Sequence, residues 1–242
     1  MADEPPPAKR VKYAPNDPRG HGHSADSSRL DFKETFQVLT GQHPNQQCFT
    51  VHREFFTQRS KFLEAASSSR WKCGTGKPVD LTEHEPEVFA SYMQCVYLGS
   101  VTVPDLPVYT EDRPLERLIT LYLLSDTLND TTTSNLVMDE IIRMSEELRH
   151  IPYPPCVDLA YRSTVAGSPL RKLCRDYYIH EAQDDALEEI YEGLLPFEFL
   201  KDVIQEFRRL ADQGALYYGR RRSINMEKCH YHLHDDEHPR CS

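Results

Sequence analysis

The 242-residue sequence predicts an α+β fold, in which a small, mostly antiparallel sheet is covered by helices and followed by an all-α extension. The residues before His52 alternate between apolar and polar, which is typical of strands. From Phe55 onward the apolar residues instead recur every three or four positions, as they do on an α-helix. Because a strand with one apolar face must be covered, we expect these helices to pack on the sheet.

Four short strands are expected where apolar and polar residues alternate. In the first, Phe36, Val38 and Thr40 share one face, and residues 41–47 supply a hairpin turn to the second. Pro104 closes the last strand, because proline cannot donate a hydrogen bond to a neighbouring strand. The expected strands are residues 35–40, 48–51, 78–81 and 100–104.

Helices are expected where apolar residues recur at helical spacing, and several carry end signals. Ser60 is placed as the N-cap of a second short helical turn, and Thr82 with Glu85 fits a capping box before the next helix. Gly99 ends that helix. The expected helical segments are residues 55–66, 88–97, 115–128, 134–149, 157–163, 187–194 and 200–207.

The helices at 115–128 and 134–149 are predicted to pack as a hairpin, because both are apolar on one face and a short polar link joins them. The sequence IPYPPC at 151–156 breaks the chain, and VAGSPLRKL at 165–173 is expected to form a turn. The apolar face expected for the last helix consists of Leu200, Val203, Ile204 and Phe207.

The composition favours a soluble protein that recognises other proteins. The formal net charge of −10 argues against a nucleic-acid binder, since such domains carry a basic face. No apolar run approaches the roughly 20 residues that span a bilayer, and the polar N-terminus lacks the apolar region of a secretory signal. The seven cysteines show no disulfide-scaffold spacing and are expected to be thiols in a reducing compartment. We therefore expect an intracellular protein without a membrane partner.

Residues 1–29 are expected to form a disordered tail, because they contain several prolines and no apolar periodicity. Inside this tail, Lys9, Arg10 and Lys12 form a basic cluster flanked by prolines, which resembles single-cluster nuclear import signals. The alternative is a solvated charge cluster without a receptor. The expected location is therefore the nucleus if the signal is read, and otherwise the cytoplasm.

A series of motifs runs in order along the middle of the chain: Phe49, Val51 and His52, then Ser60 with Phe62, then VDLTEHEPEVFASYMQCVYLGSV at 79–101, then residues 118–128. This series resembles the BTB/POZ domain in its fungal form, and VAGSPLRKL with the YHLH tail resembles the C-terminal extension of fungal members. The resemblance implies a BTB/POZ fold over residues 30–150, a helical extension over 151–222 and a Cys/His-rich tail over 223–242.

The resemblance also implies a protein-interaction module that forms homodimers and recruits another chain, as a scaffold or a ubiquitin-ligase adaptor. Cullin-binding members carry a hydrophobic residue followed two positions later by an acid, near the start of the helix that here begins around Leu115. This chain has Arg117, Leu118 and Ile119 there, so the motif is absent. His52 is expected to be structural and to bond to nearby backbone.

No enzymatic activity is expected from the sequence. It contains no phosphate-cradling glycine loop, no G-x-S-x-G elbow and no H-E-x-x-H pair, and its 10 glycines are scattered. The alternative to an interaction module is a nuclear regulator of transcription or chromatin, which would need the import signal and a zinc-bearing tail together.

The C-terminal tail contains a candidate structural zinc site formed by Cys229, His232, His234 and Cys241. Thiolate and imidazole are ligands that zinc prefers, and the two histidines would share one face of an extended strand. His230 and His238 could replace either histidine. The alternative is a polar, histidine-rich terminus without metal. A filled site would be closed to catalytic water, and the interaction function requires no cofactor.

Overall fold

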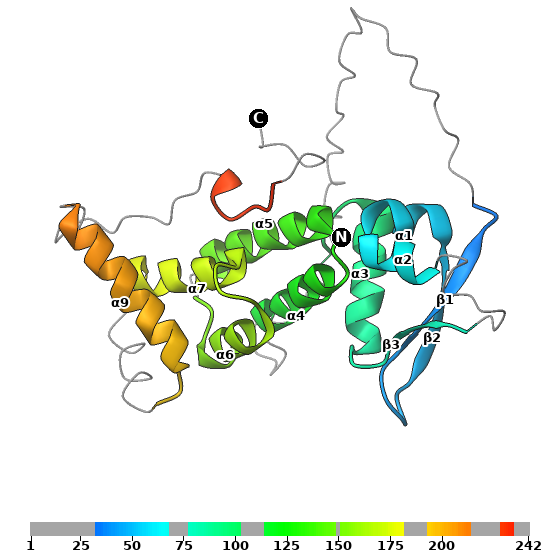
Figure 1. Cartoon of the computed structure of the whole chain (residues 1–242), viewed down its shortest axis with the longest axis horizontal. Helices are drawn as coiled ribbons and strands as arrows, with labels where there is room; N and C mark the ends of the chain where they lie inside the picture. Colours follow the sequence, from blue (N-terminus) through cyan, green and yellow to red (C-terminus); the bar gives the residue numbers. More distant parts are fainter. Residues whose placement is uncertain are drawn as a thin grey trace, which may run out of the picture. The chain divides into compact units, whose positions relative to one another are not determined.

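The computed structural model describes residues 32–67, 77–102, 114–148, 151–181, 193–213 and 228–234. All of these belong to one compact unit, Asp31–Ser242. This unit is α+β, as the sequence predicts, with a three-stranded sheet followed by helices (Figure 1). The predicted disordered tail and its import signal, Lys9, Arg10 and Lys12, lie outside the described residues.

The strands are β1 (Thr35–Thr40), β2 (Gln47–His52) and β3 (Val79–Leu81). The described helices are α1 (Arg53–Arg59), α2 (Lys61–Ser67), α3 (Pro86–Leu98), α4 (Pro114–Thr127), α5 (Thr131–Leu148), α6 (Pro154–Ser163), α7 (Pro169–His180), α9 (Phe197–Asp212) and the short 3₁₀ helix η1 (Lys228–His230).

β1 is the central strand of the sheet. It pairs antiparallel with β2, where Val38 lies opposite Phe49, and parallel with β3, where Val38 lies opposite Val79. The sheet is therefore mixed, with six antiparallel and three parallel residue pairs, because β3 enters after a crossover through α1 and α2. The predicted inner face of β1 is confirmed, since Phe36, Val38 and Thr40 are all buried.

The hairpin turn between β1 and β2 depends on Gly41, whose φ of +71° lies in the left-handed region. A Cβ at this position would lie 2.8 Å from the carbonyl oxygen of Asn45. The N–H of Gly41 donates to the carbonyl oxygen of His84 at 2.8 Å. The turn is therefore tied to the segment that leads into α3.

Two features predicted beside α3 are wrong. Its N-cap is Glu85 without a side-chain bond, and the N–H and hydroxyl of Thr82 instead donate to Asp80, at 3.0 and 2.7 Å. The carboxylate of Asp80 is only two residues away, so it competes with the capping box. Residues 100–102 are not in a strand, and the rest of that expected strand lies outside the described residues. The predicted end of α3 at Gly99 is confirmed.

The helices pack in sequence order onto the sheet and onto one another. α3 covers the inner face of the sheet, where the rings of Phe89 and Phe49 lie 5.2 Å apart between centroids. α4 and α5 form the predicted antiparallel hairpin, α6 packs on α4, and α7 and α9 pack on α6 (Figure 1). The expected BTB/POZ segment and helical extension thus share one continuous core.

Ser60 joins two helical pairs. Its hydroxyl accepts the N–H of Leu63 at 3.0 Å, which confirms the predicted N-cap of α2. The same hydroxyl donates to the carbonyl oxygen of Leu128 at 2.5 Å, at the end of α4. This single buried side chain therefore links the α1–α2 pair to the α4–α5 hairpin.

Asp130, at the N-terminal end of α5, is fully buried and holds three elements together. Its carboxylate accepts the N–H of Thr133 at 2.9 Å, as an N-cap residue does. It also accepts the hydroxyl of Tyr92 on α3 at 3.1 Å and lies 3.4 Å from the guanidinium Nε of Arg59 on α1. We name these residues the Asp130 network.

The predicted turn at 165–173 is too long. Only the residues up to Ser168 are non-helical, and α7 begins at Pro169. Proline at the first helical position has its φ already set for a helix and loses no hydrogen bond there. The sequence therefore contains a helix, Pro169–His180, where a turn was expected.

The predicted apolar face of α9 is confirmed only in part, since Leu200 and Val203 are partly buried and pack against the core. Phe199 and Leu210 are its buried residues, whereas Ile204 is 60% exposed and Phe207 is also exposed. The ring of Phe199 packs edge-on against the ring of Tyr178 at 4.9 Å, which fixes the rotation of the helix. The helix expected at 187–194 lies almost wholly outside the described residues.

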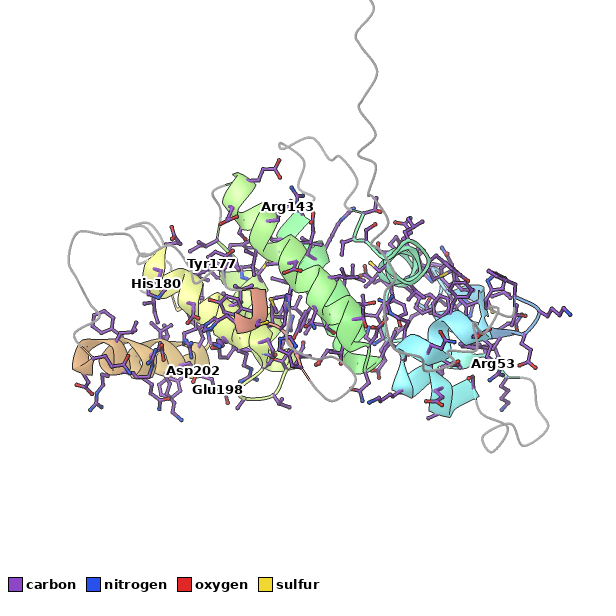
Figure 2. All side chains as sticks on the ribbon, turned by 90° about the horizontal axis from the view of Figure 1, so that it is seen from above. Arg53, Arg143, Tyr177, His180, Glu198 and Asp202 are labelled. Carbon is purple, nitrogen blue, oxygen red and sulfur yellow. The ribbon has the colours of Figure 1, made fainter. Side chains whose placement is uncertain are left out.

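Polar contacts fasten α9 to its neighbours. The carboxylate of Asp202 accepts the hydroxyl of Tyr161 on α6 at 2.9 Å. Glu198 lies 3.0 Å from the guanidinium of Arg171 on α7. Figure 2 shows both acids on the last long helix of the chain. α9 is thus held on one face by α6 and α7, while its other face carries exposed apolar residues.

Candidate functional site

The C-terminal residues singled out by the sequence lie against two helices of the body. Residues 228–234, which we name the tail segment, contact α5 and α7 through the side chains of both helices. The contacting residues are Asn135 and Asp139 of α5 and Lys172 and Asp176 of α7. Each pair is spaced i and i+4, so its two side chains share one helix face. We name the four residues the tail groove.

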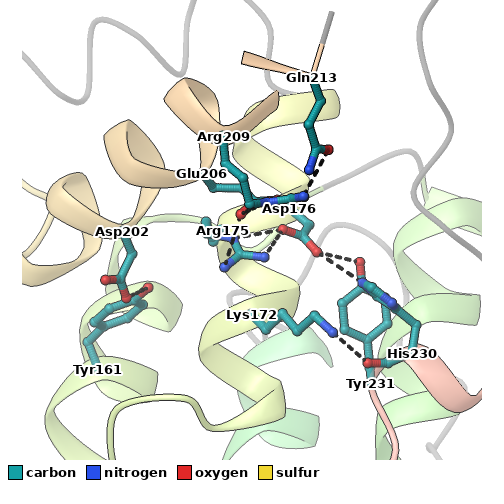
Figure 3. Close-up of polar contacts among 10 residues, drawn as sticks. All are labelled: Tyr161, Lys172, Arg175, Asp176, Asp202, Glu206, Arg209, Gln213, His230 and Tyr231. Carbon is teal, nitrogen blue, oxygen red and sulfur yellow. Dashed lines mark hydrogen bonds and ion pairs between the residues drawn. The ribbon is translucent and has the colours of Figure 1, made fainter. Parts of the chain in front are cut away.

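Tyr231 anchors the tail segment. Its side chain is only 2% exposed, and its hydroxyl donates to the carboxylate of Asp176 at 2.9 Å (Figure 3). Burial, and then the charge of Asp176, raise the pKa of Tyr231, so the phenol stays a hydrogen-bond donor at neutral pH. His230 stacks edge-on against this ring, with centroids 4.5 Å apart.

The main chain of the tail segment is bound at two points. The side-chain amide of Asn135 donates to the carbonyl oxygen of Leu233 at 3.0 Å and accepts the N–H of the same residue at 2.8 Å. The ammonium group of Lys172 donates to the carbonyl oxygen of His230 at 3.0 Å. Burial lowers the pKa of Lys172. Residues of both α5 and α7 therefore bind the main chain of the tail segment.

A network of charged residues on α7 and α9 surrounds Asp176 of the tail groove. Asp176 accepts two hydrogen bonds from Arg175, at 2.8 and 2.6 Å. Arg175 also lies 3.9 Å from Glu206 of α9, which in turn accepts from Arg209 (Figure 3). The hydrogen bond from Arg209 lowers the pKa of Glu206. The buried Asp176 is thus neutralised from within the helical body.

The predicted zinc ligands are brought close together only in part. His232 lies 2.9 Å from Asp139, and the ring centroids of His232 and His234 are 6.0 Å apart. Cys229 is half-buried, and Cys241 lies outside the described residues. Among the described residues, no three His, Cys, Asp or Glu side chains are grouped so that they could hold a metal ion. The zinc site, with His230 as an alternative ligand, stays a prediction.

The motif residues lie in the first half of the unit. Val51 is fully buried, Phe49 packs on α3, and Phe62 is partly exposed. The ring of His52 bonds to the hydroxyl of Tyr97 at 2.9 Å, so its partner is a side chain rather than the backbone we expected. His52 therefore links the end of β2 to α3.

His52 belongs to a group of stacked rings that reaches the surface. Phe32 packs edge-on against His52 at 5.5 Å and against Phe55 at 5.1 Å, and Tyr97 lies 5.5 Å from Phe55. Phe32 is 58% exposed and Tyr97 is 37% exposed. We name Phe32, His52, Phe55 and Tyr97 the aromatic patch. It exposes apolar surface beside the sheet.

Sequence reasoning missed every residue of the tail groove. Asp176 and Lys172 lie on a helix that was predicted as a turn over its first part, so no helix face could be assigned to them. No role was predicted for Asn135 and Asp139, which belong to α5. The one available signal was polar pairs at i, i+4 spacing on two neighbouring helices.

Comparison with models of known protein families gives no match for this chain, and no curated protein matches it. No helix in the described part of the chain combines the length and apolar character needed to cross a membrane.

Proposed function

We propose that the chain is a protein-interaction module of the BTB/POZ type, which self-associates and recruits another protein. The aromatic patch is the observation that carries this proposal. It exposes Phe32 and Tyr97 beside the half-buried rings of His52 and Phe55, and exposed apolar patches of this kind serve as association surfaces. Self-association through one patch in two copies needs only a twofold axis, the commonest symmetry of soluble oligomers.

Light scattering over a concentration series tests self-association. The wild-type chain should scatter as a dimer, and Phe32→Ser should weaken the dimer at least about tenfold. Phe197→Ser is the matched control, because Phe197 is also an exposed phenylalanine, 81% exposed, but lies on α9. A wild-type chain that stays monomeric, or equal effects of the two substitutions, would refute the role of the patch.

Recruitment as a scaffold or ubiquitin-ligase adaptor is the second half of the proposal. Arg117 is exposed at the start of α4 beside the exposed Glu116, whereas Leu118 and Ile119 are buried, so the exposed residues at the missing cullin motif are charged. Affinity purification of the full chain with mass spectrometry should recover partner proteins. Recovery of a cullin would favour the adaptor role, and its absence among abundant partners would favour a scaffold.

A structural zinc in the C-terminal tail remains part of the proposal. His232 supports it, because its ring is oriented by the carboxylate of Asp139, as metal-bound histidines commonly are. Cys229, His234 and Cys241 would complete the site. Elemental analysis of protein purified without chelator should find about one zinc per chain. A content near zero would remove the idea.

A further inference from the structure

The tail groove recognises its occupant mainly through the main chain. Asn135 makes both amide hydrogen bonds to Leu233, and Lys172 binds the carbonyl oxygen of His230. Every peptide carries these groups, and here the carbonyl oxygen of His230 belongs to the 3₁₀ helix η1. This part of recognition is therefore independent of the occupant's side chains.

Two side chains of the occupant bond to the groove, His232 to Asp139 and Tyr231 to Asp176, and the second contact is the more selective. The phenol of Tyr231 is buried and donates to the carboxylate of Asp176, while the ammonium group of Lys172 lies 5.6 Å from the centre of its ring. A phenylalanine would lack the donor. A phosphotyrosine would bring negative charge against a carboxylate. The groove therefore selects an unmodified tyrosine, followed two positions later by the residue that Asn135 holds.

The groove is built by the helical body without help from the tail segment. Arg175 donates two hydrogen bonds to Asp176 that do not involve the tail segment, and it lies 3.9 Å from Glu206. Asn135 and Asp139 belong to one face of α5. The charges of the groove are thus compensated before any peptide arrives, which is what a binding site requires.

From these features we propose that the tail groove is a binding site for a short peptide of a partner protein. The peptide presents an unphosphorylated tyrosine, Asn135 binds the main chain two residues later, and the chain's own residues 230–233 occupy the site as a competitor. This inference rests on the recruiting half of the proposed function, because it names where the partner binds.

The tail segment fits the role of a competitor because it is covalently joined to α9. An attached ligand acts at an effective concentration well above that of a free peptide, so it blocks weak ligands and admits strong ones. Apart from Tyr231, the tail residues Cys229, His230, His232, Leu233 and His234 are only half-buried. The tail segment therefore holds the groove through two side chains, the phenol of Tyr231 at Asp176 and the ring of His232 at Asp139.

Fluorescence anisotropy of full-length protein tests the site. The probe is a labelled synthetic peptide of residues 228–234, in which Cys229→Ser prevents oxidation. It should bind the full-length Tyr231→Ala chain, whose own tail segment has lost its anchor. Wild-type protein should bind it at least about tenfold more weakly, because the attached tail segment competes.

Matched changes assign the binding to the groove. Adding Asp176→Ala to Tyr231→Ala should abolish peptide binding, whereas adding Asp202→Ala should leave it unchanged. Asp202 also accepts a tyrosine hydroxyl, that of Tyr161, but it lies on α9 outside the groove. A peptide phosphorylated on its tyrosine should fail to bind the Tyr231→Ala chain.

Three results would overturn the proposal. They are absence of binding to a Tyr231→Ala chain with a wild-type circular dichroism spectrum, equal binding to wild-type protein, and equal binding of the phosphopeptide. If Tyr231→Ala does not fold, Leu233→Pro replaces it as the test variant. The proline removes the N–H that donates to Asn135, and it does not empty a buried pocket.

The same samples separate this inference from self-association. Light scattering that shows a dimer sensitive to Phe32→Ser, together with no peptide binding, would overturn the groove alone. A dimer that Tyr231→Ala dissociates and Phe32→Ser does not would show that the tail segment exchanges between two copies of the chain. That result would overturn the assignment to a partner protein.

Discussion

Asp130 and Asp176 are both buried, and each accepts a tyrosine hydroxyl and lies against an arginine, but their tyrosines belong to different kinds of structure. Tyr92, the partner of Asp130, lies in the middle of α3. Tyr231, the partner of Asp176, follows the short helix η1 near the end of the chain. The same chemistry therefore stabilises the whole core in one place and a seven-residue segment in the other.

The largest difference should appear when each carboxylate is removed. Asp130→Ala deletes the N-cap of α5 and leaves Arg59 and the hydroxyl of Tyr92 without their buried acceptor. Breaking a buried charged contact of this kind costs about 3 to 5 kcal/mol. Urea unfolding followed by circular dichroism should show this loss in the free energy of unfolding of the whole unit.

Two companion variants sharpen this measurement. Asp130→Asn keeps an oxygen for the N–H of Thr133 and should lose less than alanine does. Asp158→Ala breaks an exposed ion pair with Arg162 and should cost less than about 1 kcal/mol. If Asp130→Ala destabilises no more than Asp158→Ala, the Asp130 network does not hold the core.

Asp176→Ala should have a smaller and more local effect. Tyr231 loses its acceptor, and we expect about 1 to 3 kcal/mol, the cost of a buried hydrogen-bonding group left unpaired. Hydrogen exchange at the amide of Leu233 should accelerate strongly, because this amide is protected only while the tail segment is bound to Asn135. Asp202→Ala should leave that amide protected, and an unchanged rate in Asp176→Ala would contradict the comparison.

Alkaline pH should reveal the Asp130 network through Tyr92. Burial, and then the charge of Asp130, raise the pKa of Tyr92 in the folded chain. Its contribution to stability is complete below about pH 10, the pKa of an unfolded tyrosine, and is lost as the pH rises further. Above pH 10 the free energy of unfolding should fall more steeply for wild type than for Tyr92→Phe, by about 1.4 kcal/mol per pH unit. Parallel curves would show that Tyr92 ionises equally in both states.

The smallest effect should come from Ser60→Ala. The substitution removes the N-cap bond to Leu63, which typically costs about 1 kcal/mol. The carbonyl oxygen of Leu128 keeps the N–H of Phe62 at 3.4 Å, so it is not orphaned. Ser91→Ala removes a hydroxyl that bonds only within α3 and should change the urea midpoint less. A reversed order would show that Ser60 does not link the helical pairs.

The first half of the fold was predictable because local signals there agree with tertiary packing. Phe36, Val38 and Thr40 alternate on β1, and Ser60 and Gly99 lie at helix ends as their side chains favour. The parallel pairing of β3 with β1 was not predictable, because a strand of three residues carries no signal for the neighbour or the direction of its pairing. The capping box failed for a related reason, since a nearer carboxylate took its donors.

The candidate site was less predictable than the fold. No role was predicted for Tyr231, which lies between two histidines, because its buried partner, Asp176, lies 55 residues earlier in the chain. Asp176 itself reads as a surface residue, since a sequence does not show that a later segment will cover it. The predicted ligand His232 lies in the tail segment, where its ring bonds to Asp139, and its role as a zinc ligand stays a prediction.

The alkylation rates of three fully buried cysteines can report local opening of the fold. Cys95 lies on α3, Cys156 on α6 and Cys174 on α7, and burial raises the pKa of Cys95 to about 11 and raises that of Cys174 as well. Alkylating reagents attack the thiolate, so at neutral pH each sulfur reacts only after its helix opens. The order in which these thiols are modified therefore records whether the sheet half and the helical half open together or one after the other.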